Sequence, residues 1–244
     1  MRKPTAKTSR QLTLEQARHP TGHGGWRPGA GRPPGRTKCG HVARERFAAR
    51  YPLHVTLHVV DGVKLRREPV LRVVRQVLAA AGHSDAFRVV EFNVLGNHLH
   101  LVVETAGPEA LARGMQGLIV RLARRVNESL GRTGKLFTER YHARPLRTPR
   151  EVRNVLRYVL LNARHHAAER GQKLASHWID PYSSALWFAG WRDPVRTDAP
   201  WLRPLLKQPR PTAEAKTWLL AIGWRRHGLL AFDDVPGGAW PAPE

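Results

Sequence analysis

The stretch VLGNHLHLVVE, residues 94–104, places two histidines one residue apart inside an apolar run. Because successive side chains of a β-strand point to opposite faces of a sheet, a strand here presents His98 and His100 on the same face as Glu104. The other face carries the apolar side chains that a core needs, namely Leu99, Leu101 and Val103. The pattern therefore predicts a strand with one buried face and one face that displays two imidazoles.

Three neighbouring segments extend this strand into a sheet. RVVEFNV (88–94) is strand-like, and the short connection Leu95-Gly96-Asn97 that follows it is typical of a hairpin. HVTLHVV (54–60) is rich in β-formers, and KLFTERYHARPL (135–146) is interpreted as a strand with a polar end.

Apolar residues at helical spacing predict two helices, in 68–82 and 108–131. A third helix begins at Thr148, a cap residue that is followed by Pro149 and by the carboxylate of Glu151. The resulting order, β α β β α β α, is typical of an α+β, ferredoxin-like domain, in which helices cover one face of an antiparallel sheet.

The net charge of +22 indicates a polyanionic partner, and nucleic acid is the leading candidate. The sequence has no apolar run near 18 residues and no signal peptide, so a membrane partner is disfavoured and a cytoplasmic, nucleoid-associated protein is expected. The single cysteine, Cys39, excludes an intrachain disulfide framework and a cysteine-cluster zinc site. Arginines on the polar faces of the 108–131 helix are candidates for phosphate contacts: Arg113, Arg121, Arg124 and Arg125.

The first 50 residues differ in composition from the rest of the chain. Residues 1–50 contain 12 Lys and Arg against 2 acidic residues and are too rich in Gly, Pro and Arg to form a core, which predicts a flexible arm. Its AGRPPGR segment resembles the hooks that enter DNA minor grooves, which makes Arg32 and Arg36 candidate DNA contacts, although a solvated tail without a defined partner is equally compatible. The folded domain is expected over 51–167.

Residues 168–244 form the third predicted part of the chain. They contain seven of the eight tryptophans and one plausible helix, 213–228. We expect an extension that packs on the folded domain.

Two imidazoles about 7 Å apart on one strand face can converge on one cation, because neutral imidazole is a common ligand of divalent metals. Histidines that face solvent or bond to their neighbours would give the same pattern. The helix that begins at Thr148 adds Tyr158 and Asn162, four residues apart and therefore stacked on one side, away from its apolar stripe, with His165 nearby. An amide oxygen is a reasonable third ligand for Mg²⁺ or Mn²⁺, and a tyrosine one turn away could attack a phosphorus, although an ordinary amphipathic helix remains an alternative. Tyr141 is the rival nucleophile.

With these motifs in place, residues 52–166 resemble the HUH-type single-tyrosine transposases of the insertion-sequence-200-like group, above all their REP-associated relatives. The resemblance rests on NHLHLVVE (97–104), on GMQGLIVRLARRVN followed by GRTGKLFTERYHARPL, and on RYVLLNARHH, which is similar to the family pattern Tyr-(Ile/Val)-x-x-Asn. Ala163 departs from this pattern, in which proline commonly follows the asparagine, so the local helix geometry is in doubt.

The resemblance implies a metal-dependent enzyme that cleaves and rejoins DNA. It assigns His98, His100 and Asn162 as ligands of a divalent ion, Mg²⁺ or Mn²⁺, and Tyr158 as the nucleophile that forms a 5′-phosphotyrosine. Single-stranded or hairpin DNA is the expected substrate. The family also allows a homodimer, since related enzymes can assemble an active site across two subunits.

Other functions also fit the sequence. A non-catalytic, domesticated DNA-binding protein needs only the charge and the fold. A metal-dependent phosphodiesterase that uses water as its nucleophile would not need Tyr158. A protein-binding module explains neither the paired histidines nor the tyrosine and asparagine of the helix.

Overall fold

The computed structural model describes residues 46–234 except 197 and 199, and these residues belong to one compact unit. The arm predicted over residues 1–50 lies almost entirely outside the described residues, as do Arg32 and Arg36. Among the described helices, none is long and apolar enough to cross a membrane.

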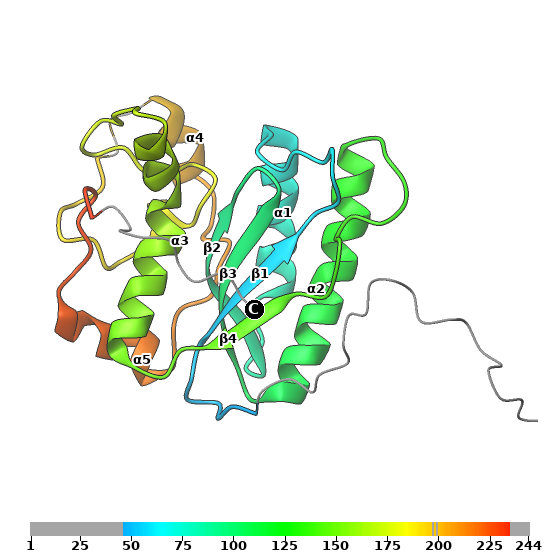
Figure 1. The fold of residues 1–244 in the computed structure, drawn as a ribbon, viewed down its shortest axis with the longest axis horizontal. Coiled ribbons are helices and arrows are strands. Elements are labelled where there is room, and N and C mark those ends of the chain that lie inside the picture. Colours follow the sequence, from blue (N-terminus) through cyan, green and yellow to red (C-terminus); the bar gives the residue numbers. More distant parts are fainter. Residues whose placement is uncertain (1–45, 197, 199, 235–244) are drawn as a thin grey trace, which may run out of the picture. The chain divides into compact units, whose positions relative to one another are not determined.

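A four-stranded antiparallel sheet forms the centre of the unit (Figure 1). Its strands are β1 (Leu53–His58), β2 (Phe87–Val94), β3 (His98–Thr105) and β4 (His142–Pro145), in the spatial order β2-β3-β1-β4. The predicted hairpin joins β2 and β3, and the amide of Leu95 closes it by donating to the carbonyl of His98 at 2.8 Å. The α+β class and the antiparallel sheet are thus confirmed.

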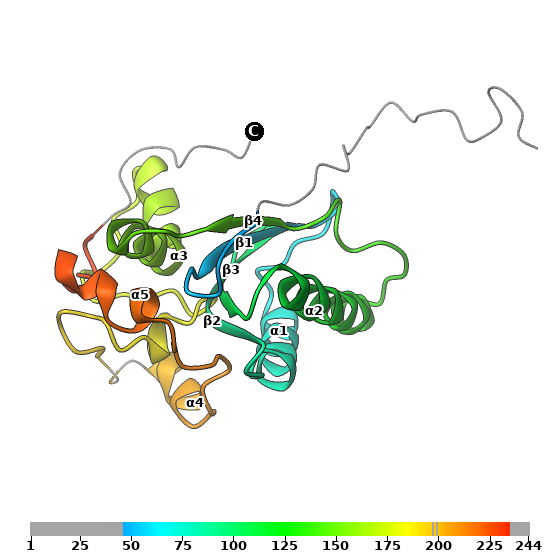
Figure 2. The same ribbon diagram turned by 90° about the horizontal axis from the view of Figure 1, so that it is seen from below.

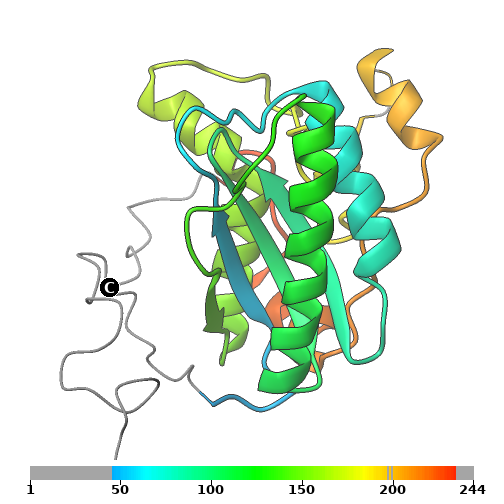
Figure 3. The same ribbon diagram turned by 90° about the vertical axis from the view of Figure 1, so that its right-hand side faces the viewer.

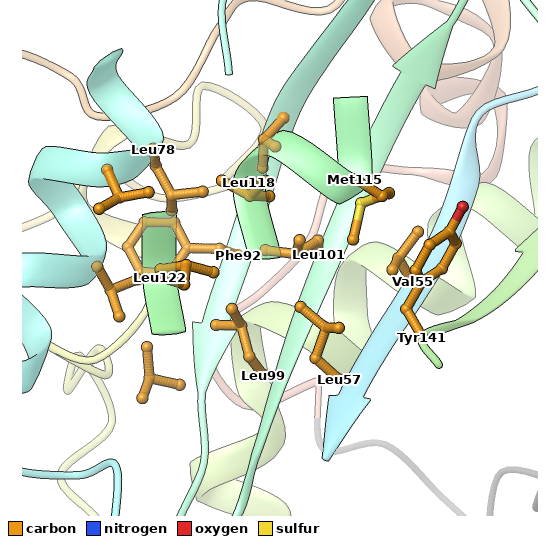
Figure 4. Packing of buried hydrophobic residues seen from close by; sticks show 14 of the residues in the cluster. Val55, Leu57, Leu78, Phe92, Leu99, Leu101, Met115, Leu118, Leu122 and Tyr141 are labelled. Carbon is orange, nitrogen blue, oxygen red and sulfur yellow. The ribbon is translucent and has the colours of Figure 1, made fainter. Parts of the chain in front are cut away.

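The first two helices, α1 (Glu68–Ala81) and α2 (Pro108–Ser129), cover one face of this sheet (Figure 2). Their apolar stripes pack against the alternate strand residues that include Leu99 and Leu101 (Figure 4). These two helices match the expectation that helices cover one face of the sheet.

The third helix, α3 (Pro149–Glu169), lies against the opposite face, which corrects that expectation for the domain as a whole (Figure 3). Its stripe packs on Val90 of β2 and Val102 of β3, and together they form a second apolar cluster. The histidine-bearing face therefore also carries apolar side chains, Val90 and Val102, and these are what α3 buries.

The start of α3 forms as predicted. Thr148 caps the helix by accepting from the amide of Glu151 at 3.2 Å, and Glu151 Oε2 accepts from the amide of Thr148 at 3.1 Å. Pro149 lies at the start of the helix, where its missing N–H costs no hydrogen bond. This reciprocal cap fixes the point at which α3 enters the sheet face.

The strand predicted over 135–146 is shorter than expected, since only His142–Pro145 is regular β4. The segment before it makes one isolated bridge to the residue after β1, between Phe137 and Val59. Leu136 and Phe137 are buried in the first core, and that packing replaces a regular ladder.

The segment after α3 packs on the sheet and α3 through short elements: η2 (Ala185–Trp187), η3 (Pro200–Leu202), α4 (Arg203–Leu206), α5 (Trp218–Ala221) and η4 (Gly223–His227). The single helix predicted over 213–228 is therefore wrong. Glu104 of β3 accepts from the amides of Lys216 and Thr217 at 2.9 and 2.8 Å, so its carboxylate holds this segment against the sheet before a helix can begin.

Candidate metal and tyrosine site

Four histidines gather on one face of β1 and β3. The register pairs His58 with His98 and Thr56 with His100, which places all even-numbered residues of the two strands on the same side. The ring centroids are 5.0 Å apart for His58 and His98, 4.7 Å for His98 and His100, and 5.1 Å for His54 and His100. The two predicted ligands thus belong to a larger cluster of imidazoles.

Helix α3 brings Tyr158 to this cluster. The Tyr158 ring lies edge-on to His100 and His54, with centroid distances of 5.2 and 6.0 Å. Asn93 of β2, which is paired with His100 in the sheet, is fully buried and donates to the carbonyl of Val159 at 2.6 Å. This bond fastens the turn of α3 between Tyr158 and Asn162 to the strand beside His100.

Asn162 completes the group. Its side chain is fully buried and lies one turn along the helix from Tyr158. Burial raises the pKa of Tyr158 above its usual value, so the phenol is protonated at neutral pH. The structure therefore brings together Tyr158, Asn162 and the histidines, which come from separate parts of the sequence.

Three histidines of the cluster, His54, His98 and His100, are neutral at physiological pH. Burial, aided by neighbouring histidines, lowers the pKa of His98 to about 4 and that of His100 well below its ordinary value. The pKa of His54 is likewise lowered to about 4, chiefly by burial and then by Arg144. A neutral imidazole keeps a nitrogen lone pair, which is what a metal ligand requires.

The donor atoms fit a divalent ion. His100 Nε2 and both polar atoms of the Asn162 side chain are buried and have no hydrogen bond within the described part of the chain. Asn97 Oδ1 lies 2.7 Å from His98 Nδ1, and an amide oxygen there can only accept, which leaves His98 Nε2 with its lone pair. Among the described residues, no three His, Cys, Asp or Glu side chains form a group that could hold a metal ion.

His165 lies outside this arrangement of donors. Its Nε2 is 3.2 Å from Glu169, and His166 Nδ1 is 2.8 Å from the same carboxylate. The histidine pair of α3 is thus paired with an acid of its own helix.

The rival nucleophile, Tyr141, lies on the other side of the sheet. It is buried in the first core with Val55 and Met115 (Figure 4). This position favours the interpretation that Tyr141 is a packing residue.

The four arginines predicted to contact phosphates are all on α2, at positions that are exposed: Arg113, Arg121, Arg124 and Arg125. Because α2 covers the face that carries Leu99 and Leu101, the sheet separates these arginines from the histidine cluster. The structure therefore does not bring them to the tyrosine.

Sequence reasoning missed His54, Thr56, His58 and Asn93. HVTLHVV contained a signal, because His54 and His58 are an even number of residues apart and so share a strand face. Their partners depend on the register between β1 and β3, which the sequence of either strand alone does not contain.

Comparison with known protein families finds a match over the sheet and the first part of α3. Residues 50–162, which contain all four strands, Tyr158 and Asn162, match the family model described as transposase IS200 like. Residues 50–162 are therefore similar to the IS200-like transposases. No curated protein matches the chain by sequence.

Two solved structures are similar to part of this chain. One is a REP-associated tyrosine transposase bound to a REP hairpin, with 13% identity, a TM-score of 0.44, and coverage of 58% of this chain and 79% of that one. The other is a Deinococcus radiodurans protein described as a transposase, with 13% identity, a TM-score of 0.35, and coverage of 57% and 100%.

Proposed function

We propose that this protein cleaves and rejoins single-stranded or hairpin DNA through a covalent bond to Tyr158. The observation that carries the proposal is the position of Tyr158, edge-on to His100 and one turn before the buried, unbonded amide of Asn162. The IS200-like family of residues 50–162 supports DNA as the substrate.

His98, His100 and Asn162 would hold a divalent ion, Mg²⁺ or Mn²⁺. Such an ion supplies charge stabilisation to a phosphate oxygen. The pKa values of the two histidines, lowered by burial, suit this role because they keep both rings neutral at physiological pH.

Tyr158 would act as the nucleophile. Its Oη forms a bond to phosphorus and loses its proton, while the bond from phosphorus to the 3′ oxygen breaks and that oxygen leaves as a 3′-hydroxyl. The product is a 5′-phosphotyrosine. Because the phosphodiester energy is kept in the covalent link, another 3′-hydroxyl can reverse the step and join a new strand.

The exposed arginines of α2 would contact DNA that flanks the cleaved bond, since the sheet separates them from Tyr158. Arg32 and Arg36 of the N-terminal segment are proposed as further backbone contacts. The protein would act at the nucleoid. The cleavage step described above uses the Tyr158 of a single subunit.

The direct test is covalent trapping. The wild-type protein, Tyr158→Phe and Tyr141→Phe are incubated with end-labelled DNA hairpins carrying single-stranded flanks, with Mn²⁺, Mg²⁺ or EDTA. We expect a slowed band on a denaturing gel for the wild type and for folded Tyr141→Phe, and none for Tyr158→Phe or with EDTA.

An adduct that persists in Tyr158→Phe would refute the assignment of the nucleophile. Cleavage with two free ends would instead indicate a phosphodiesterase that uses water. Binding that is insensitive to EDTA and never yields cleavage would indicate a DNA-binding protein without this activity.

A further inference from the structure

The β1 histidine His54 has no role in the proposed chemistry, yet it lies against one of the proposed ligands. It is 7% exposed, and its Nε2 is 3.1 Å from His100 Nδ1, with the two rings stacked. Thr56 Oγ1 lies 3.2 Å from the same His100 nitrogen. His100 Nδ1 is thus surrounded by β1 groups, whereas its Nε2 is buried and unbonded among the described residues.

The two nitrogens of a neutral imidazole are not equivalent, because one carries the proton and the other carries the lone pair. If His100 Nδ1 carries the proton, it donates to β1 and leaves the Nε2 lone pair for a metal. If Nε2 carries the proton, its buried N–H has no acceptor among the described residues. The lone pair is then on Nδ1, which faces β1, and Nε2 has none to offer a metal. The partner of Nδ1 therefore decides whether His100 can be a ligand.

The neighbouring ligand shows the same arrangement. His98 Nδ1 faces Asn97 Oδ1 at 2.7 Å, and this acceptor requires the proton on Nδ1. Asn97 is adjacent to His98 in the chain, whereas His54 reaches His100 across the strand pair. The two histidines would then offer the same nitrogen, Nε2, each oriented by a partner on Nδ1.

We propose that His54 is a positioning residue that accepts the Nδ1 proton of His100 through its own Nε2, so that His100 Nε2 is the metal-ligating atom. This inference rests on the proposed function, since it assigns His100 as a ligand. Thr56 Oγ1 lies 3.2 Å from the same nitrogen, slightly farther than the 3.1 Å of His54 Nε2. In many proteins, a metal-bound histidine is oriented by a residue that hydrogen-bonds to its other ring nitrogen. Loss of that residue typically lowers metal affinity about 10- to 100-fold.

The test compares His54→Phe with His54→Gln. Phenylalanine keeps a ring but cannot accept a hydrogen bond, whereas the glutamine Oε1 can accept near the position of Nε2. His58→Phe is the matched control, because His58 stacks on His98 from the same strand. All three are made in the Tyr158→Phe background, so that metal affinity is read without DNA cleavage.

Calorimetric titration with Mn²⁺ should show affinity about 10- to 100-fold lower for His54→Phe, and within a few-fold of the parent for His54→Gln and His58→Phe. Long-range ¹⁵N–¹H spectra of histidine-labelled, metal-free wild-type protein should show the proton of His100 on Nδ1. The second readout does not depend on any variant folding. A merely structural role of His54 would not predict rescue by glutamine.

The proposal is overturned if the proton of His100 is found on Nε2, or if folded His54→Phe binds Mn²⁺ as tightly as the parent. Failure of the proposed function has a different signature. In that case the wild type would bind no Mn²⁺ and form no covalent adduct, while the tautomer spectrum would still report whether His54 accepts from His100.

Discussion

At the scale of single residues, the site contains two buried amide side chains, Asn162 and Asn93, that differ in their hydrogen bonding. Asn162 is fully buried with both polar atoms unbonded among the described residues, whereas Asn93 is equally buried but donates to Val159. A buried amide without partners costs about 1–3 kcal/mol of stability, so folding alone does not explain Asn162. Such a group is expected where a ligand completes its bonding.

This contrast gives a prediction for Asn162→Leu, a substitution of similar size. The metal-free variant should be at least as stable as the wild type, because leucine has no amide to desolvate, while its affinity for Mn²⁺ falls at least tenfold. Asn93→Leu is the control and should be destabilised by about 1–3 kcal/mol, since the buried hydrogen bond from Asn93 to the carbonyl of Val159 is lost. Urea unfolding without metal and calorimetry with Mn²⁺ measure the two effects. An Asn162→Leu variant as unstable as Asn93→Leu would show that Asn162 has a structural role.

Much of the site could be predicted at this scale. The alternation in HLHLVVE predicts the shared face of His98 and His100, and the four-residue spacing predicts that Tyr158 and Asn162 stack. The juxtaposition of strand and helix is not local, because it depends on α3 packing over Val90 and Val102. The role of His54 depends on a strand register, which no single segment specifies.

At the scale of elements, α3 is the part on which the site depends, because it supplies both Tyr158 and Asn162. Its beginning is encoded locally by Thr148, Pro149 and Glu151, and for that reason the sequence predicts it correctly. The helix predicted over 213–228 fails for the opposite reason. Its first residues bond to Glu104, which is more than 100 residues away in the chain, and helical spacing does not reveal that contact.

The capping box gives a prediction for this element. Thr148→Ala should lower the free energy of unfolding by about 1 kcal/mol, because the amide of Glu151 loses its acceptor at the start of α3. Thr148→Ser keeps a hydroxyl and should retain most of that stability. Both variants should still form the Tyr158 adduct, since the cap lies more than two turns before the tyrosine. Chemical denaturation monitored by circular dichroism measures the difference. Equal stability of the alanine and serine variants would show that the cap contributes nothing.

At the scale of the whole molecule, the segment after α3 is joined to the sheet by buried acids of the strands. Glu104 of β3 accepts from Lys216 and Thr217, and Glu91 of β2 faces Arg210 at 3.3 Å. Glu91 is 2% exposed, and its Oε2 has no hydrogen bond among the described residues. Its charge is thus only partly compensated, which makes this junction sensitive to pH.

The last prediction concerns that junction. Burial raises the pKa of Glu91 from 4.5 to about 7, against the opposing effect of Arg210. Between these two pH values the folded protein binds more protons than the unfolded chain, so this group's contribution to stability is fully present below pH 4.5 and is lost as the pH rises through about 7.

Glu91→Gln removes the titration and keeps a neutral side chain of the same shape. Relative to this variant, the wild type should lose on the order of 3 kcal/mol of unfolding free energy between pH 4.5 and pH 8, because each tenfold difference in proton affinity between the folded and unfolded states corresponds to about 1.4 kcal/mol. The buried histidines act in the opposite direction but are common to both proteins, so their effect cancels in the difference. Urea unfolding of both proteins at several pH values measures this difference. A difference that does not change with pH would mean that folding leaves the pKa of Glu91 at its unfolded value.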